Sequence, residues 1–311
     1  MSEEHGPREL VDHAQRAEEA GFDFVAISDH YHPWVKAQGH APFAWTVLGA
    51  IAARTQRVGL TTAVTCPSLR YHPSIVAQFA ATLGILSQGR FTLGLGSGEN
   101  LNEHVIGAGW PAPHTRQAML SEAVDIIAQL WKGEEVSFDG EFFEVDRAKL
   151  WDVPDQPPAL AIAAGGPKAA ELAASKGAGI FTTEARPELL KSYQSAGGKG
   201  ARYAEIALSW ARTEAEAVRV AHERFSFGSL GWPVMTDLPT PGSFEAAVSH
   251  VRPEDVAEQV ACGPDPERHV ASVKKYLNAG FDHLVLLGVG PDQAGFLRFW
   301  KEELAPRLRK L

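Results

Sequence analysis

Short apolar runs rich in Val, Ile, Leu and Ala alternate with longer amphipathic runs along most of this chain. That alternation is typical of repeated βα units, in which helices cover a parallel sheet. The strands of such a sheet are buried on both faces, so they are apolar nearly throughout. The pattern therefore predicts an α/β fold with seven strands, at Phe24–Ser28, Val58–Thr65, Phe91–Leu95, Ala159–Ala163, Gly179–Thr182, Glu205–Trp210 and His283–Leu287.

The length of the chain, 311 residues, fits either two ordinary domains or one large α/β barrel. Helices are predicted around Leu10–Ala20 and Arg116–Trp131, where apolar residues lie three and four positions apart. Two predicted helices end in Ala-Gly-Phe-Asp before a strand, with Gly21 and Gly280 as left-handed caps. This recurrence favours one repeating barrel, although a doubly wound sheet would give similar signals.

Two stretches depart from the alternation and are interpreted as insertions into a single domain that spans residues 1–311. Residues 133–158 contain Asp139-Gly140 between short apolar runs, which predicts a β-hairpin. Residues 225–252 are rich in Gly, Pro and Trp and lie between the sixth and seventh predicted strands. Long connections of this kind usually shape a functional site, so we expect this one to cross an open end of the fold.

Composition limits what the chain binds. Hydrophobic residues make up 45% and charged residues 22% of the sequence, as in a globular domain with a large core. The net charge of -9 argues against nucleic acid and favours a small-molecule partner, because phosphate backbones require clustered cations. Cys66 and Cys262 have no metal-ligand spacing and are expected to be reduced thiols. The sequence shows no secretory leader and no long apolar run, so we expect a cytoplasmic protein that does not enter a membrane.

Three groups of polar or glycine residues directly follow predicted strands. The carboxyl ends of parallel strands meet at one edge of a sheet, where α/β enzymes place reactive residues. The first group, Ser28–Trp34, combines one carboxylate, two imidazoles and an indole. The second, Gly94–His104, is rich in glycine but has neither a Walker lysine nor a complete GxGxxG. The third, Ala163–Lys168, brings paired glycines to a helix N-terminus that suits a phosphate, so the three groups together indicate one site.

A metal-dependent hydrolase is an alternative at this edge. Asp29, His30 and His32 follow an early strand with the spacing of a metal-binding pair. Such a site needs further ligands from later strands, and of their ends only Asp292 comes near. We therefore expect no metal site, and hydrolysis is a remote alternative.

Six segments share their motifs and their order with a known family: SDHYHPW, QGHAPFAW, RYHPSIVAQ, GRFTLGLGSGENLNEH, AIAAGGP and GFDHLVLLGVGPDQ. The chain resembles the luciferase-like flavin and deazaflavin oxidoreductases, in particular the branch related to F420-dependent glucose-6-phosphate dehydrogenase. The resemblance implies a TIM (β/α)8 barrel, commonly a homodimer, that uses the 5-deazaflavin coenzyme F420 for hydride transfer. An FMN-dependent oxidoreductase or monooxygenase of the same fold is the alternative.

The resemblance implies roles for residues that follow the first and third predicted strands. Asp29 would contact the deazaflavin, and His30 would exchange the proton of a substrate hydroxyl. An imidazole suits this task because it titrates near neutral pH. Trp34 would lie beside the reacting carbon and exclude water, while Glu99 would serve as the partner acid or base at the deazaflavin ring.

Further positions are implied to bind the coenzyme. Ala63-Val64 falls where the family places a strained bulge, often a cis peptide bond that does not involve proline. Cys66 stands where the sugar-phosphate enzymes have threonine, which puts one coenzyme hydrogen bond in question. The positions that would contact the polar edges, phosphate and acidic tail of F420 are Ser97, Gly98, Asn102, Gly165, Gly166, Lys168 and Ala169.

The substrate end departs from the sugar-phosphate enzymes. After the strand that ends at Thr182 they have a basic residue, whereas this chain continues with Thr183 and Glu184. Gln259 replaces an arginine that clamps phosphate in those enzymes. A doubly charged phosphate needs such cations, so we predict that glucose 6-phosphate is a poor substrate. The expected substrate is an uncharged alcohol or its carbonyl product, which would contact Thr182, Thr183, Gln259 and Trp232.

An eight-stranded barrel needs one strand more than the seven predicted above. Members of the resembling family have a further strand before a segment like Ser2–His5, and this first strand is expected to be missing here. We therefore predict a barrel that is open or distorted between Phe24–Ser28 and His283–Leu287. An ordered eighth strand supplied by another part of the chain would contradict this prediction.

Overall fold

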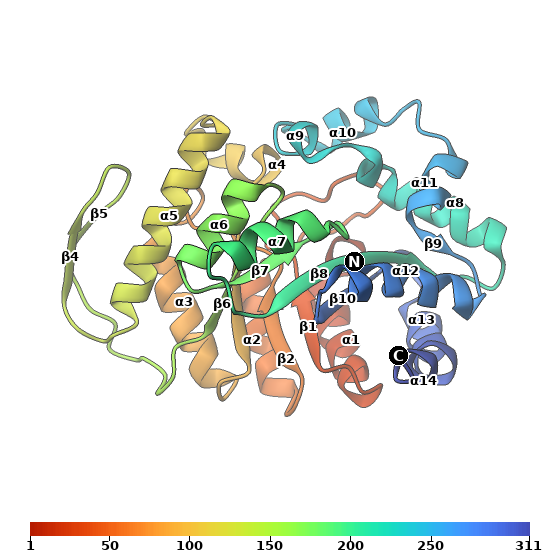
Figure 1. The fold of residues 1–311 in the computed structure, drawn as a ribbon, viewed down its shortest axis with the longest axis horizontal. Coiled ribbons are helices and arrows are strands. Elements are labelled where there is room, and N and C mark those ends of the chain that lie inside the picture. The colour runs from red at the N-terminus through yellow and green to blue at the C-terminus, as the bar shows by residue number, and fades with distance from the viewer.

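A parallel sheet forms the centre of the molecule in a computed structural model that describes residues 1–311. Seven strands pair in the order β1-β2-β3-β6-β7-β8-β10, and β9 pairs with the end of β8. Helices surround the sheet, so its strands are covered on both faces (Figure 1). The strands are β1 (Phe24–Ile27), β2 (Gly59–Thr62), β3 (Phe91–Leu95), β6 (Ala159–Ala163), β7 (Gly179–Thr182), β8 (Arg202–Ser209), β9 (Ala261–Cys262) and β10 (His283–Gly288).

The helices pack their apolar faces on the outside of this sheet. The largest apolar cluster contains 41 buried residues and lies mainly between the sheet and α2, α3, α5 and α6. Proline occupies the first turn of most helices, where its missing N–H is no loss and its fixed φ suits the turn. The helices are α1 (Pro7–Glu19), α2 (Ala44–Arg54), α3 (Pro73–Leu86), α4 (Asn100–Glu103), α5 (Pro113–Leu130), α6 (Pro167–Ser175), α7 (Pro187–Ser195), α8 (Glu214–Phe225), α9 (Trp232–Met235), α10 (Pro241–Ala247), α11 (Pro253–Gln259), α12 (Pro266–Ala279), α13 (Gln293–Phe299) and α14 (Ala305–Leu308). Shorter turns form η1 (Ser2–Glu4), η2 (His104–Ile106), η3 (Ser226–Ser229) and the π-helical η4 (Trp300–Leu304).

All seven predicted strands are present, and those at β3, β6 and β7 have the predicted bounds. Gly21 and Gly280 have φ values of 82° and 104°, which confirms their predicted left-handed conformation. The first insertion contains the predicted hairpin, formed by β4 (Val136–Asp139) and β5 (Glu144–Ala148). The second insertion is helical, a point that the sequence did not indicate, and its α9 and α10 lie near α4 (Figure 1).

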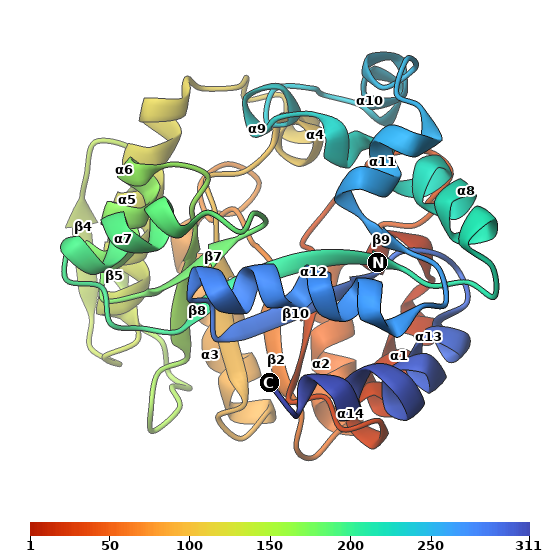
Figure 2. The ribbon, with the colours of Figure 1, turned by 45° about the vertical axis from the view of Figure 1, so that its right-hand side comes forward.

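The barrel is open between β1 and β10. β1 pairs only with β2, and β10 pairs only with β8, so these two strands are the ends of the curved sheet. The unpredicted β9 lies beside Leu208 and Ser209 of β8 and does not fill the opening. The prediction of an open barrel at this place is therefore confirmed. Figure 2 shows β8 and β10 crossing the front of the molecule.

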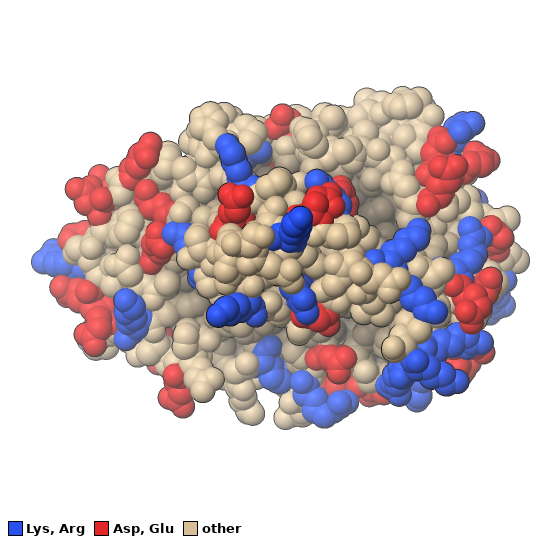
Figure 3. Space-filling view, in the orientation of Figure 1, with Lys and Arg blue, Asp and Glu red and all other residues tan.

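Charged side chains of both signs are mixed on the face shown in Figure 3, and basic side chains gather mainly beside α13 and α14. This face thus has no continuous basic strip of the kind that binds a nucleic-acid backbone. None of the helices combines the length and the apolar character that crossing a membrane requires.

Candidate active site

Asp29 is the centre of a buried hydrogen-bond network beside the carboxyl ends of β1 and β2. Its Oδ2 accepts from Trp45 Nε1 at 3.1 Å and from Thr65 Oγ1 at 2.8 Å. Its Oδ1 accepts from the Tyr71 hydroxyl at 3.1 Å and from Arg70 Nη2 at 3.2 Å. Asp29 is 2% exposed, and both carboxylate oxygens already have two donors. Its side chain therefore holds these loops together, and a contact with the deazaflavin stays a prediction.

Arg70 extends this network to the residues that follow β3. Its backbone N–H donates to Glu103 Oε2 at 2.8 Å, and its Nε lies 3.5 Å from Glu103 Oε1. Burial raises the pKa of Glu103 to about 7, although the charge of Arg70 acts in the opposite direction. The network therefore joins three strand ends through residues of which the sequence analysis named only Asp29.

His30 lies directly against Glu3, a residue of η1 that no sequence motif indicated. His30 Nδ1 is 2.7 Å from Glu3 Oε1, and the two side chains are 8% and 3% exposed. A carboxylate at this distance places the ring proton on Nδ1 of a neutral imidazole. Nε2 is then the nitrogen with a free lone pair, as a proton acceptor requires.

The charges around this pair set the protonation of His30. Burial lowers the pKa of His30, but the hydrogen bond and charge of Glu3 outweigh it, so the pKa is raised above its usual value. Glu99 acts in the same direction as Glu3, and Arg70 opposes them. Burial raises the pKa of Glu3, yet His30 and the Met1 ammonium bring it down to about 2. Glu3 is therefore ionised at neutral pH and favours the imidazolium form of His30.

Trp34 forms an aromatic wall next to His30. The edge of His30 meets it at a centroid distance of 5.0 Å, and Phe227 stacks on it at 4.9 Å. Phe244 packs against it at 5.1 Å and Trp232 at 6.5 Å. Three of these rings belong to the second insertion, which therefore shapes the surroundings of His30. Trp34 is only 8% exposed, so little water reaches this side of the imidazole.

Trp232 joins the second insertion to the end of β7. Its Nε1 donates to Thr183 Oγ1 at 2.9 Å. Thr182 is 4% exposed and donates to the carbonyl of Glu184 at 3.0 Å, so its hydroxyl is used within its own loop. Gln259 is exposed on α11, and its amide donates to a hydroxyl of η3 at 3.4 Å. The structure thus brings Thr183 and Trp232 together, and the hydrogen bond of Gln259 goes to neither.

Arg186 is a basic residue near the end of β7 that the sequence analysis overlooked. Its Nη1 donates to the carbonyl of Gly165 at 3.1 Å, which joins the loops after β6 and β7. Its Nε is 2.7 Å from Glu188 Oε1, and Glu184 Oε2 lies 3.7 Å from its Nη1. The chain therefore has a cation two positions after Glu184, held between two carboxylates.

Asn102 holds Glu99 and the loop after β1 in one arrangement. Its Oδ1 accepts from the backbone N–H of Tyr31 at 2.9 Å and of His32 at 3.3 Å. Its Nδ2 lies 3.4 Å from Glu99 Oε2 as a donor. Asn102 is 1% exposed, whereas Glu99 is partly exposed at the start of α4. Glu99 is therefore the member of this group that can meet a ligand.

Close packing of the loops after β2 and β3 requires glycine. The Ala63-Val64 peptide bond is cis, as the resemblance implied. A Cβ on Gly98, which has a φ of 83°, would lie 2.7 Å from Cys66 Sγ. Burial raises the pKa of the Cys66 thiol, whose sulfur lies 3.2 Å from Ser68 Oγ. Cys66 is therefore a packed, protonated thiol below this loop.

An open cradle lies at the N-terminus of α6. Gly166 precedes the helix and Pro167 begins it, as the sequence predicts. A Cβ on Gly165 or Gly166 would meet nothing within 4 Å, so this space is free for a ligand. Lys168 is exposed, and Ala169 packs its methyl into the core, which leaves its backbone N–H for binding. Open backbone donors beside a lysine fit the phosphate of a coenzyme tail.

The residues of the metal-site alternative have other partners. His30 pairs with Glu3, and His32 stacks on His104 at a centroid distance of 5.7 Å. Asp29 accepts hydrogen bonds from four side chains. No group of three or more His, Cys, Asp or Glu side chains is arranged to hold a metal ion. No feature of the site thus favours the metal-dependent hydrolase.

The family of the chain follows from comparison with known proteins. The sequence profile of luciferase-like monooxygenases matches residues 1–283. The chain belongs to this luciferase-like family. The predicted family and the predicted TIM-barrel fold of its members are therefore confirmed, with the opening between β1 and β10 described above.

Relatives within the family are F420-dependent enzymes. The chain is 38% identical over 325 residues to an F420-dependent glucose-6-phosphate dehydrogenase of Amycolatopsis mediterranei, covering 100% of this chain and 97% of that protein. The same enzyme of Nakamurella multipartita is 37% identical over 322 residues, with coverages of 100% and 95%. A solved F420-dependent secondary alcohol dehydrogenase, in complex with an F420-acetone adduct, has a TM-score of 0.91 and 30% identity, with coverages of 98% and 96%. The F420-dependent tetrahydromethanopterin reductase of Methanopyrus kandleri, at 22% identity and a TM-score of 0.79, shares the fold.

Proposed function

We propose that the protein is an F420-dependent oxidoreductase that interconverts an uncharged secondary alcohol and its ketone. Its relatives at 37% and 38% identity are F420-dependent dehydrogenases, and the structure with a TM-score of 0.91 is of a secondary alcohol dehydrogenase. The observation that carries the proposal is the buried His30–Glu3 pair beside the aromatic wall of Trp34. A proton acceptor in an apolar setting is what oxidation of an uncharged alcohol requires.

The residues that would hold the coenzyme lie after β3 and β6. Gly165, Gly166 and the backbone of Ala169 form the open cradle for its phosphate, with Lys168 beside them. Ser97 is partly exposed after β3, and its hydroxyl would contact a polar edge of the ring. When bound, the deazaflavin supplies the two-electron acceptor for the hydrogen on the alcohol carbon.

His30 takes the proton of the alcohol hydroxyl through Nε2. Its Nδ1 stays bound to Glu3, whose negative charge stabilises the imidazolium that forms. Trp34 and its aromatic neighbours keep water from competing for Nε2. Glu99, partly exposed and held near Asn102, is proposed as the partner acid or base at the coenzyme ring. In the reverse direction His30 returns the same proton to the ketone oxygen.

Glucose 6-phosphate is the second candidate substrate, and two observations favour it. The most similar curated relatives named above bear that activity, and Arg186 supplies a cation near the end of β7. Its guanidinium already has Glu184 and Glu188 as partners, however, and a phosphate dianion would have to displace them. We therefore keep the prediction that this sugar phosphate is a poor substrate.

One experiment separates these possibilities. The purified protein is titrated with F420 and, separately, with FMN, and F420 reduction is then followed at increasing 2-propanol or glucose 6-phosphate. We expect saturable F420 binding and a kcat/KM at least tenfold higher for the alcohol. Binding of FMN alone would overturn the coenzyme assignment. Saturation with micromolar glucose 6-phosphate would overturn the substrate assignment.

We also propose that the protein forms a homodimer through α3. Ile75 and Leu86 on this helix are 42% and 56% exposed, and their spacing puts them on one face with Phe79. Phe43, which packs against Phe79, is 46% exposed. Light scattering after size exclusion should give twice the chain mass, and Leu86→Lys should halve it. A monomeric wild-type protein would contradict the proposal.

A further inference from the structure

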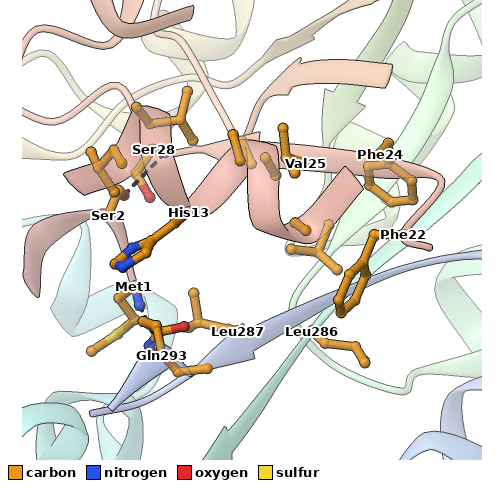
Figure 4. Close-up of a pocket in the computed structure, with 18 of the residues that line it drawn as sticks. Met1, Ser2, His13, Phe22, Phe24, Val25, Ser28, Leu286, Leu287 and Gln293 are labelled. Carbon is orange, nitrogen blue, oxygen red and sulfur yellow. Dashed lines mark hydrogen bonds between the residues drawn. The ribbon is translucent and has the colours of Figure 1, made fainter. Parts of the chain in front are cut away.

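The opening between β1 and β10 is a groove in the barrel wall. It holds about 1110 Å³ of empty volume, part of it open to solvent, and 18 of its 25 lining residues are hydrophobic. Figure 4 shows side chains of both strands on its two sides, among them Val25, Phe24, Leu286 and Leu287. Residues of α1 and α13 cover its outer side, and Glu205 lies on the side of the barrel interior.

The groove is bordered by two unused hydrogen-bonding edges. β1 pairs only with β2 and β10 only with β8, so each turns its other edge towards the opening. Unpaired backbone groups at a sheet edge are a template for another strand. Both bordering strands run in the same direction in a parallel sheet, so a strand between them pairs in parallel with each.

The first residues of the chain fix the direction and the end of such a strand. The Met1 ammonium donates to the carbonyl of Gly288 at 2.8 Å, at the carboxyl end of β10. The backbone N–H of Ser28, just after β1, donates to Ser2 Oγ at 3.4 Å (Figure 4). A parallel strand in the groove therefore has its carboxyl end at Met1. β1 and β10 have four and six residues, so about five or six residues fill the opening.

Glu205 adds a charge requirement. It lies on β8 opposite Val285, lines the groove, and has no hydrogen-bond or ion-pair partner. Burial raises the pKa of its carboxyl to about 7, and the charge of Glu3 acts in the same direction. His30 and the Met1 ammonium oppose this effect without contacting the carboxylate. A basic side chain pointing into the barrel from the groove would give Glu205 the partner that a buried carboxylate needs.

We propose that this groove is a binding site for one extended peptide strand, paired in parallel with β1 and β10. Successive side chains of a strand point to opposite faces, so alternate residues would meet α1 and α13 or the barrel interior. The first set is apolar, because Leu10, Ala14, Phe296 and Leu297 line that side. The second set includes one Lys or Arg next to Glu205. The site is separate from the proposed alcohol and coenzyme sites.

The test adds a strand of this pattern in two ways. A six-residue segment with alternating Val and one central Lys is joined directly before Met1, and the same sequence is offered as a free peptide. Hydrogen exchange followed by mass spectrometry should show at least tenfold slower exchange in Phe24–Ile27 and His283–Gly288. The melting temperature of the joined protein should rise by about 5 °C or more.

Matched controls decide whether a paired strand is the occupant. A segment with two central prolines cannot form the ladder and should leave exchange unchanged. Replacing the central Lys by Glu should weaken peptide binding at least fivefold, and Glu205→Gln should remove that difference, whereas the exposed Glu258→Gln should not. Unchanged exchange with both the joined and the free segment overturns the proposal. Equal protection by the proline segment also overturns it, because the groove would then take any apolar ligand.

Discussion

Replacing Glu3 by glutamine tests whether the carboxylate tunes His30. Glutamine keeps the size of the side chain and removes its charge, while Glu99, Arg70 and Glu205 stay in place. The imidazolium of His30 then loses its main stabilising partner, and burial, which lowers the pKa, is no longer outweighed. The pKa of His30 must therefore fall.

The distance and burial of the pair give the size of this shift. An opposite charge within about 4–6 Å moves a pKa by about 1–3 units. Glu3 Oε1 lies 2.7 Å from His30 Nδ1, and both side chains are less than a tenth exposed. A fall of about 1–3 units is therefore expected, which corresponds to about 1.4–4 kcal/mol at 1.36 kcal/mol per unit.

The sign of the effect on catalysis follows from the role of His30. Only neutral His30 accepts the alcohol proton, so oxidation should increase with pH as His30 loses its proton. In Glu3→Gln this limb of the kcat/KM profile should move to lower pH by the same number of units. At high pH the rate should fall at least tenfold, because a charge-assisted hydrogen bond worth about 1.5–3 kcal/mol is lost.

The assay is the pH dependence of F420 reduction by the alcohol, with the exposed Glu19→Gln as the matched control. The control should keep the wild-type profile. A structural role alone would lower the rate equally at all pH values and leave the limb in place. An unmoved limb in Glu3→Gln, with F420 still bound at wild-type affinity, would refute the reasoning.

Three further substitutions test other parts of the site. Asp29→Asn removes the buried charge that faces Arg70 and should lower the free energy of unfolding by about 3–5 kcal/mol in urea titrations; a change below 1 kcal/mol would contradict the network described here. Trp232→Phe removes the bond to Thr183 and should change KM for the alcohol several-fold, as expected for about 0.5–1.5 kcal/mol, with F420 affinity unaffected in a binding titration. Phe244→Ala should lower the melting temperature measured by calorimetry, because this ring is fully buried and its loss costs about 3–5 kcal/mol.

The sequence predicted those parts of the fold that local patterns determine. Phe91–Leu95, Ala159–Ala163 and Gly179–Thr182 have the predicted bounds, because polar or glycine residues closely border each apolar run. β9 has two residues, Ala261 and Cys262, which is too short for a periodic signal. The opening of the barrel was predictable because the number of strands a closed barrel needs is a property of the fold, independent of local pattern.

The site was predictable only where its residues follow a strand. His30, Trp34 and Glu99 do so, whereas Glu3 lies in a short turn at the start of the chain and meets His30 through the tertiary fold. A lone acidic residue has no spacing that reveals such a partner. Arg186 was missed for a different reason, because the comparison stopped at Glu184 and the cation lies two positions further on.

Glu4 explains how a turn at the chain start can position Glu3. Its carboxylate accepts from the backbone N–H of Gly290 at 3.0 and 3.1 Å and binds the Met1 ammonium at 3.2 Å. These bonds tie η1 to the loop that follows β10, so Glu3 is held next to His30 by contacts outside the groove. A strand bound between β1 and β10 should therefore raise stability and leave the pKa of His30 nearly unchanged. Glu4→Gln, in contrast, should loosen η1 and lower the rate of alcohol oxidation, although Glu4 itself lies outside the His30–Glu3 contact.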